Sequence, residues 1–249
     1  MMREATLGWL TARPIAHRGL HDRSRGIVEN TPTAFAAAIA GNYAIECDLQ
    51  ITSDGEAVVF HDEALERLTT SSGMVKDHSA EQMKRLTIRD SSDRVQTLAE
   101  LLAQVEGQVP LVIEIKSLWD GNGALTMRAL DVLKSYTGPH CLMSFDPDAV
   151  TMVCEVSPQT PRGIVADRGD DDYYDFLPLP RRQELRTFSH LARTQPDFIS
   201  FYCGELPFAP IAAYRAAGHP VISWTIRSPA QAALARRYSD QITFEGFAA

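Results

Sequence analysis

Short apolar segments alternate with segments of helical character through most of this chain, and no other feature of the sequence constrains the fold as strongly. From Pro110 onward the apolar segments begin at Pro110, Cys141, Arg162, Asp197, Pro220 and Gln241. Helical patterns are expected over 97–105, 123–136, 147–156, 181–193, 207–217 and 229–238. Strands that alternate with helices in this way are typical of βαβ units, which build a parallel sheet.

Two earlier apolar segments, beginning at Pro14 and Ala44, bring the number of expected main strands to eight. A helix is expected between them, because Thr31 is suited to cap it and Pro32 to occupy its first position. A TIM barrel needs eight βα repeats and typically about 250 residues, and the chain has 249. The predicted fold is therefore α/β, a (β/α)₈ TIM barrel formed by a single domain over residues 1–249.

The segment 63–93 interrupts the alternation soon after the second strand. It follows a short apolar run, Ala57–His61, and holds one expected helix, Ser79–Leu86. Ser79 and Gln82 have the spacing of a capping box at the start of that helix. The segment 63–93 is therefore predicted to be a small insertion within the barrel.

The leader, Met1–Ala12, has one arginine and no long apolar core, so it does not have the pattern of a secretory signal. Since few residues follow the last strand, the leader is expected to close the bottom of the barrel. No segment reaches the roughly 18 apolar residues that a membrane helix needs. The irregular spacing of the cysteines indicates reduced thiols rather than a zinc site or a redox pair; they are Cys47, Cys141, Cys154 and Cys203. A cytoplasmic protein without stable membrane insertion is predicted.

The net charge of −8 disfavours binding to nucleic acid or to an anionic membrane surface. It is compatible with a site that gathers carboxylates around a cation, although acidic residues that only confer solubility would give the same total. The loop 167–175 is unusually acidic. If this loop lies near the site, it should disfavour anionic substrate groups.

Charged side chains are found where several of the expected strands end. Glu46 and Asp48 occupy alternate positions of the second strand, and Glu114 and Lys116 do the same in the third. Residues two apart in a strand point to the same face, and chemistry in a TIM barrel gathers at the carboxyl ends of its strands. We therefore expect Glu46, Asp48 and Glu114 to converge inside the mouth of the barrel.

Three converging carboxylates repel one another unless positive charge compensates them. Oxygen ligands suit a hard cation, so the predicted cofactor is one Mg²⁺ or Ca²⁺ held by Glu46, Asp48 and Glu114. The alternative is a network of ion pairs with Arg18 and Lys116, which needs no metal.

His17 and His61 each end an apolar run, on either side of the Glu46–Asp48 pair in the sequence. A single histidine in such a run is more often a hydrogen-bonded core residue, but two beside a carboxylate pair suit general acid and base catalysis. At a phosphorus centre, one histidine would deprotonate the nucleophile and the other would protonate the leaving oxygen. Arg18 and Lys116 would supply the positive charge that a phosphoryl group needs.

Several motifs occur in a fixed order. They are His17-Arg18-Gly19, Glu29-Asn30-Thr31, Glu46-x-Asp48, Thr52-Ser53-Asp54-Gly55, His61-Asp62, Leu65-Glu66-Arg67-Leu68-Thr69 and Glu114-x-Lys116. Each motif is weak alone, but the ordered set resembles the glycerophosphodiester phosphodiesterase family. The resemblance covers most of the chain and is densest from Pro14 to Lys116.

This resemblance implies a TIM barrel with a small insertion after the second strand. It also implies metal-dependent hydrolysis of glycerophosphodiesters to an alcohol and glycerol 3-phosphate. The site residues that it implies are the catalytic His17 and His61, the metal ligands Glu46, Asp48 and Glu114, and the substrate-binding Arg18, Lys116 and Trp224. For Trp224, an aromatic of the barrel core is the alternative.

The C-terminal segment 242–246 lacks the Thr-Asp-x-Pro ending often seen in the family, so no pocket residue is assigned to the eighth loop. A second interpretation is a phospholipase D-like barrel that acts on lysophospholipids or sphingolipids and has an exposed apolar rim. A third is a noncatalytic barrel that binds a phosphorylated ligand or partner. The sequence leaves open the head group, the native ion, the roles of the two histidines and the oligomeric state.

Overall fold

The computed structural model describes residues 7–170 and 172–249. Its parallel strands close into a barrel, because β1 pairs with both β2 and β9 and the remaining strands follow in the order β9-β8-β7-β6-β5-β4-β2. The barrel strands are β1 (Ile15–Ala16), β2 (Ala44–Ile51), β4 (Leu111–Ile115), β5 (His140–Ser144), β6 (Arg162–Ala166), β7 (Phe198–Tyr202), β8 (Val221–Ile226) and β9 (Gln241–Phe244). The predicted (β/α)₈ TIM barrel is therefore confirmed.

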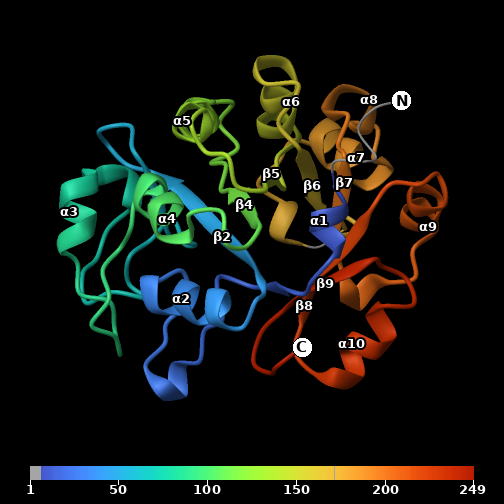
Figure 1. Cartoon of the computed structure of the whole chain (residues 1–249). Coiled ribbons are helices and arrows are strands. Elements are labelled where there is room, and N and C mark those ends of the chain that lie inside the picture. Colours follow the sequence, from blue (N-terminus) through green and yellow to red (C-terminus); the bar gives the residue numbers. More distant parts are fainter. Residues whose placement is uncertain (1–6, 171) are drawn as a thin grey trace.

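Helices surround the strands, and most of them cover the outer face of the barrel (Figure 1). They are α1 (Gly8–Thr11), α2 (Pro32–Ala40), α3 (Ala80–Arg85), α4 (Leu98–Val105), α5 (Ala124–Leu133), α6 (Pro147–Val156), α7 (Leu179–Thr187), α8 (Leu191–Thr194), α9 (Ala209–Ala216) and α10 (Pro229–Ala235). Thr31 caps α2 by accepting a hydrogen bond from the Ala34 N–H, and Pro32 begins the helix, as the sequence predicts.

The prediction of one continuous helix over 181–193 is wrong. α7 ends at Thr187, because Phe188 adopts a left-handed backbone conformation with a φ of 55°, and α8 begins only at Leu191. The Phe188 ring is buried against Phe201 of β7, with 6.4 Å between the ring centroids. Packing of this ring against the barrel accompanies the break between the two helices, and the helical pattern of the sequence does not reveal such a long-range contact.

Apolar residues of the segment 63–93 form a small hydrophobic cluster together with Val28, Val58, Phe60 and Val95. β3 (Ala57–Val59) runs antiparallel to β2 and leads the chain away from the barrel. Beyond it, Leu65 and Met83 are buried together with other apolar residues of this segment. The capping box predicted at the start of α3 is formed, and Figure 1 shows α3 outside α4, at the edge of the molecule.

The inward-facing positions of the barrel change from apolar to charged along the strands. Ile15, Ala44 and Val112 belong to a buried apolar cluster that includes Leu10 of α1. Two positions further along the same strands come His17, Glu46 and Glu114, which share the inward face because side chains alternate. An apolar layer near the amino ends therefore supports a charged layer at the carboxyl ends. α1 belongs to the apolar layer through Leu10. Residues 1–6 of the leader lie outside the described residues.

Gly19 is required by backbone geometry and by packing in the loop after β1. Its φ is +79°, and a Cβ built on it would lie 2.9 Å from the Ala34 Cβ of α2. Gly55 has the same φ of +79°, but nothing lies within 4 Å of its Cβ position. We expect Gly55→Ala to reduce the free energy of unfolding by about 1–2 kcal/mol through backbone strain. Gly19→Ala should cost about 1–3 kcal/mol more, because α2 must also shift.

Urea denaturation of both variants measures this difference. Equal losses for Gly19→Ala and Gly55→Ala would show that contact with α2 contributes nothing to the need for glycine at position 19.

Candidate active site

A cavity of about 820 Å³ opens at the carboxyl ends of the barrel strands. Seven of the eight predicted site residues line it: His17, Arg18, Glu46, His61, Glu114, Lys116 and Trp224. The eighth, Asp48, is almost fully buried beside them. Strands β1, β2, β4 and β8 and the segments that follow β1 and β3 thus bring together residues separated by up to 207 positions, from His17 to Trp224.

Glu46, Asp48 and Glu114 converge, and each is almost completely buried. Asp48 of β2 stands beside Glu114 of β4 in the strand register, and Glu46 lies two positions earlier on the same inward face. Carboxylate oxygens from the three residues all lie within 4.8 Å of one another. The sequence therefore predicted this convergence correctly.

Two of the three carboxylates are paired with cations. Lys116 Nζ lies 2.6 Å from Glu114 Oε1 and 2.9 Å from Asp48 Oδ1, and Arg18 Nε lies 3.5 Å from Asp48 Oδ2. Asp48 Oδ2 also accepts a 2.8 Å hydrogen bond from the Asn30 side chain. The ion-pair network that the sequence left open is thus present around Asp48 and Glu114.

Glu46 differs from the other two carboxylates. Its Oε2 accepts a 2.8 Å hydrogen bond from the Arg18 backbone N–H, but no lysine or arginine side chain of the described residues forms an ion pair with it. Burial raises the pKa of Glu46 well above its ordinary value, and repulsion from Asp48 and Glu114 raises it further. The ion pairs therefore leave negative charge at Glu46 that they do not compensate.

The pKa values of the other two carboxylates shift in opposite directions. Burial acts to raise the pKa of Asp48, but Lys116, His61 and Arg18 outweigh it and hold this pKa well below the usual range. For Glu114, burial raises the pKa in spite of Lys116. A cation added to the cluster would thus mainly stabilise the ionised forms of Glu46 and Glu114, whose pKa values are raised.

His17 follows β1 and is held from behind by Glu245. Its Nδ1 lies 2.5 Å from Glu245 Oε2, and its Nε2 lies 4.0 Å from Glu46 Oε2. A hydrogen bond from Nδ1–H to the carboxylate leaves Nε2 available on the side of the carboxylate cluster. Burial lowers the pKa of His17, against the hydrogen bond with Glu245, and Arg18 lowers it further.

His61 has a similar arrangement. Its Nδ1 lies 2.7 Å from Asp62 Oδ1, and Arg67 Nε lies 2.5 Å from the other oxygen of Asp62. Arg67 also binds Glu29, which in turn binds Arg18. Each imidazole thus has a carboxylate at Nδ1, so Nε2 is the nitrogen available for proton transfer in both rings.

The sequence did not identify Glu245 as a site residue, although segment 242–246 was noted for its unusual ending. An acidic residue directly after the last barrel strand was the signal that could have revealed it. The last barrel strand, β9, thus contributes Thr243, which lines the cavity, and the residue after it, Glu245, binds His17.

Aromatic rings form the outer wall of the cavity. Trp224 lies 5.4 Å from Phe145 and 5.3 Å from Tyr202 between ring centroids, and its Nε1 donates a 3.0 Å hydrogen bond to the Ser200 carbonyl. Trp119 lines another part of the wall and was not predicted.

The acidic loop 167–175 lies at this rim. Asp167, Tyr173 and Tyr174 all line the cavity, and the Tyr174 hydroxyl donates a 3.0 Å hydrogen bond to Asp167 Oδ2. Residue 171 lies outside the described residues. The loop therefore lies near the site, which is the position in which its acidic residues are expected to disfavour anionic substrate groups.

Comparison with solved structures supports the fold. A phosphodiesterase from Oleispira antarctica, solved in complex with the product sn-glycerol-3-phosphate, superimposes with a TM-score of 0.78 at 20% identity, over 95% of this chain and 94% of that one. A glycerophosphodiester phosphodiesterase from Thermotoga maritima superimposes with a TM-score of 0.71 at 22% identity, over 92% of each chain. At these identities the likeness concerns the barrel alone.

Curated relatives match over shorter regions. A glycerophosphodiester phosphodiesterase from Caldanaerobacter subterraneus subsp. tengcongensis is 40% identical over 111 residues, which are 41% of this chain and 44% of that protein. A Bacillus subtilis protein of the same name is 29% identical over 170 residues, 59% of this chain and 57% of its own length. The chain thus spans about half the length of these two relatives.

A family profile covers more of the chain. The profile described as the glycerophosphoryl diester phosphodiesterase family matches residues 17–241, a range that begins at His17 and includes every site residue discussed except Glu245 and Thr243. This match extends over most of the barrel, and the motifs that carry the resemblance lie inside it. The chain therefore belongs to the glycerophosphoryl diester phosphodiesterase family.

Proposed function

We propose that this protein hydrolyses glycerophosphodiesters to an alcohol and glycerol 3-phosphate in a reaction that depends on a divalent cation. The observation that carries the proposal is the placement of His17 and His61 around the buried cluster of Glu46, Asp48 and Glu114, at the mouth of a TIM barrel. Two further findings support it. Relatives share the name glycerophosphodiester phosphodiesterase, and the Oleispira antarctica structure holds sn-glycerol-3-phosphate as product.

The residues of the cluster fit a hard divalent cation. All three donors are carboxylates, which Mg²⁺ and Ca²⁺ prefer, and the raised pKa of Glu46 shows that the protein's own cations do not fully compensate its charged form. Glu46, Asp48 and Glu114 would hold the ion. When bound, it would supply positive charge to a phosphate oxygen.

The two histidines move the protons. One accepts the proton of the attacking oxygen, which is water or the 2-hydroxyl of the substrate's own glycerol. The other donates a proton to the oxygen of the departing alcohol, so the P–O bond breaks without expelling an alkoxide. Attack by the 2-hydroxyl gives a cyclic phosphate, which a water must then open to yield glycerol 3-phosphate. Arg18 and Lys116 hold the phosphate charge, and the Trp224 ring packs against the organic part of the substrate.

The negative charge of the rim bears on the choice of head group. Asp167 and Glu63 line the cavity outside the cluster. We expect faster turnover of glycerophosphocholine than of a glycerophosphodiester with an anionic head group. Asp167→Asn should narrow this ratio by about fivefold, which corresponds to about 1 kcal/mol of partly screened repulsion.

The test is a panel of glycerophosphodiesters, assayed after chelation and again after Mg²⁺, Ca²⁺ or Mn²⁺ is added back. Loss of turnover on chelation and its recovery with one of these ions is the expected result. Ligand binding without hydrolysis under all three ions would instead favour the noncatalytic barrel.

One observation favours a second candidate, hydrolysis of lysophospholipids. Tyr173 lines the cavity, the Phe176 ring packs against Trp119 of the cavity wall, and both side chains are exposed, as an acyl chain would require. Two features oppose it: the cysteines of the described residues form no disulfide, and the rim is acidic. Product analysis on lysophosphatidylcholine and glycerophosphocholine separates the two functions.

The predicted location is not tested by the structure. None of the helices in residues 7–170 and 172–249 combines the length and the apolar character that crossing a bilayer requires. The cytoplasmic location therefore stays a prediction from the sequence.

A further inference from the structure

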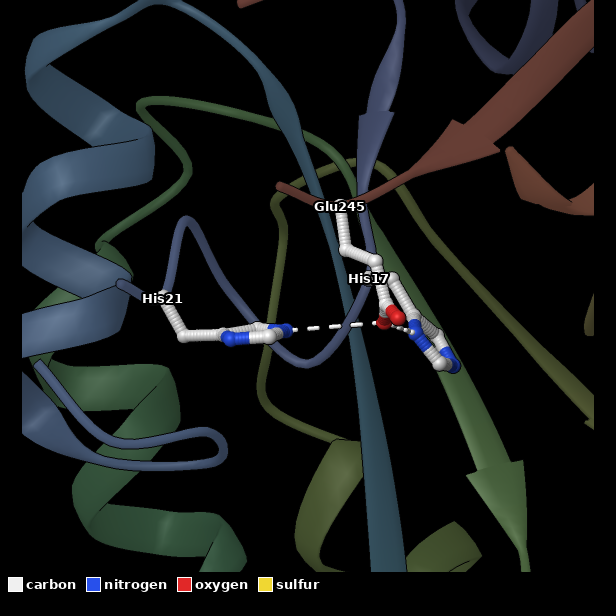
Figure 2. A group of neighbouring side chains, drawn as sticks. All are labelled: His17, His21 and Glu245. Atoms are coloured by element: carbon white, nitrogen blue, oxygen red, sulfur yellow. Dashed lines mark hydrogen bonds and ion pairs between the residues drawn. The ribbon is translucent and has the colours of Figure 1, made fainter. Parts of the chain in front are cut away.

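A second group of metal-binding side chains lies behind His17. It consists of His17, His21 and Glu245, whose ligand atoms all lie within 4.8 Å of one another. His21 belongs to the loop between β1 and α2, and Glu245 follows β9. Figure 2 shows both imidazole rings directed at the Glu245 carboxylate from opposite sides. His17 lines the substrate cavity but His21 and Glu245 do not, so this group adjoins the three-carboxylate cluster and shares no carboxylate with it.

One carboxylate oxygen faces two imidazole nitrogens. Glu245 Oε2 lies 2.5 Å from His17 Nδ1 and 3.6 Å from His21 Nε2. The second distance is beyond hydrogen-bond reach. His21 Nε2 is shielded from solvent and forms no hydrogen bond with the residues that the structure describes. A shielded ring nitrogen held 3.6 Å from a carboxylate, at ion-pair rather than hydrogen-bond distance, is a group that a metal ion would satisfy.

We propose that His17 Nδ1, His21 Nε2 and Glu245 Oε2 form a second metal site, selective for a transition metal such as Zn²⁺, and that occupation of this site inhibits the enzyme. In tetrahedral zinc coordination the Zn–N and Zn–O distances are about 2.0–2.1 Å, which places ligand atoms about 3.3 Å apart. The separation of 3.6 Å between His21 and Glu245 already approaches this value. The contact of 2.5 Å between His17 and Glu245 must open by about 0.8 Å.

The donor atoms distinguish the two sites. Two imidazole nitrogens and one carboxylate oxygen suit Zn²⁺ or Cu²⁺, whereas three carboxylates suit Mg²⁺ or Ca²⁺. The side chains of His21 and Glu245 are 20% and 19% exposed although His21 Nε2 itself is shielded, so an ion reaches the site from solvent once the contact between His17 and Glu245 opens. The fourth coordination position would be left to water.

The positive charge of Arg227 opposes binding and sets a limit on affinity. Its Nε lies 2.8 Å from Glu245 Oε1, the oxygen that the histidines do not face. This contact turns Oε2 towards the two rings. The Arg227 side chain is 59% exposed, so solvent screens much of its repulsion for an incoming cation. We expect Zn²⁺ to bind in the micromolar rather than the nanomolar range.

Inhibition follows from the chemistry of imidazole and rests on the proposed role of His17. A neutral imidazole carries one proton and one lone pair. When a metal takes the lone pair of Nδ1, the proton must reside on Nε2, which can then no longer accept one. Such a ring is also a much weaker acid than an imidazolium. His17 therefore loses both the base role and the acid role while the metal is bound.

Electron paramagnetic resonance of added Cu²⁺, with Mg²⁺ in excess, tests the site directly. Wild-type protein should show nitrogen hyperfine structure from two imidazoles. His21→Ala should lose part of this structure, and the exposed His219→Ala should keep all of it. His21→Gln provides the same test if His21→Ala melts at a lower temperature. Identical spectra for wild type and both His21 variants would overturn the site.

Enzyme inhibition by Zn²⁺ tests the consequence. His21→Ala should keep the turnover measured without Zn²⁺, since His21 does not touch the substrate cavity, and should raise the inhibitory Zn²⁺ concentration roughly tenfold or more. Inhibition that is unchanged in His21→Ala would contradict the inference. A protein that hydrolyses no glycerophosphodiester but shows the nitrogen-coordinated Cu²⁺ signal would refute the proposed function and leave the metal site standing.

Discussion

His17→Ala and His61→Ala are each expected to lower the kcat for glycerophosphocholine by roughly 10²–10⁴-fold, the usual contribution of a general acid or base. Each ring has a carboxylate at Nδ1, at 2.5 Å for His17 and 2.7 Å for His61. Removal of either ring eliminates one of two proton transfers and leaves the carboxylate cluster in place. KM should change much less than kcat, because neither histidine carries the main charge that binds the phosphate.

His219→Ala is the matched control for these variants. His219 is exposed and immediately precedes Pro220 and β8, so it lies at the amino end of the barrel, opposite the site. It should keep wild-type turnover. Near-normal kcat in both His17→Ala and His61→Ala would show that the two imidazoles do not perform the chemistry.

Glu46→Gln is expected to stabilise the metal-free protein and to remove most of the stabilisation that Mg²⁺ or Ca²⁺ confers. Without metal, the ionised Glu46 is buried without a cationic partner among the described residues, so the neutral amide should raise the free energy of unfolding by about 1–3 kcal/mol. Gln can still accept the hydrogen bond from the Arg18 N–H. An ion at 100 times its Kd stabilises the wild type by about 2.7 kcal/mol.

Asp48→Asn is the control, because its expected effect on the stability of the metal-free protein has the opposite sign. Asp48 is held ionised by Lys116 and Arg18, so its neutralisation should destabilise the metal-free protein. Thermal melting with chelator and with added metal measures both variants. A lower melting temperature for metal-free Glu46→Gln than for metal-free wild type would contradict the excess of negative charge at this site.

The raised pKa of Glu46 makes the free energy of unfolding of the metal-free protein depend on pH. The folded-state pKa of Glu46 lies above its ordinary value of 4.5, so between these two values the folded protein binds more protons than the unfolded chain. The contribution of Glu46 to stability is therefore lost as the pH rises above about 4.5. Urea denaturation of the metal-free protein should show a shallower decline with pH in Glu46→Gln.

The sequence was sufficient to predict the barrel and the convergence of the three carboxylates, for a simple reason. Side chains alternate along a strand, and the carboxyl ends of parallel strands meet at one end of a barrel. Glu46, Asp48 and Glu114 therefore had to lie close together once their strands were recognised. His17 was predicted in the same way, because it directly follows the first strand.

Contacts between distant loops could not be predicted in this way. Glu245 reaches His17 across 228 positions, and its role depends on the direction in which the chain leaves β9. The break between α7 and α8 depends on the packing of Phe188 against β7. The position of Trp119 in the cavity wall depends on the path of the loop after β4. Strand order could place Glu245 at the mouth of the barrel, but neither strand order nor periodicity reveals which residues these three segments contact.

The central claim is that one divalent cation is bound by Glu46, Asp48 and Glu114 in the space that His17 and His61 share. A crystal grown with Mn²⁺, examined by anomalous scattering at the manganese edge, measures this directly. The account predicts an anomalous peak bonded to oxygens of all three carboxylates. A structure that holds Mn²⁺ elsewhere and has no peak among these carboxylates would contradict it.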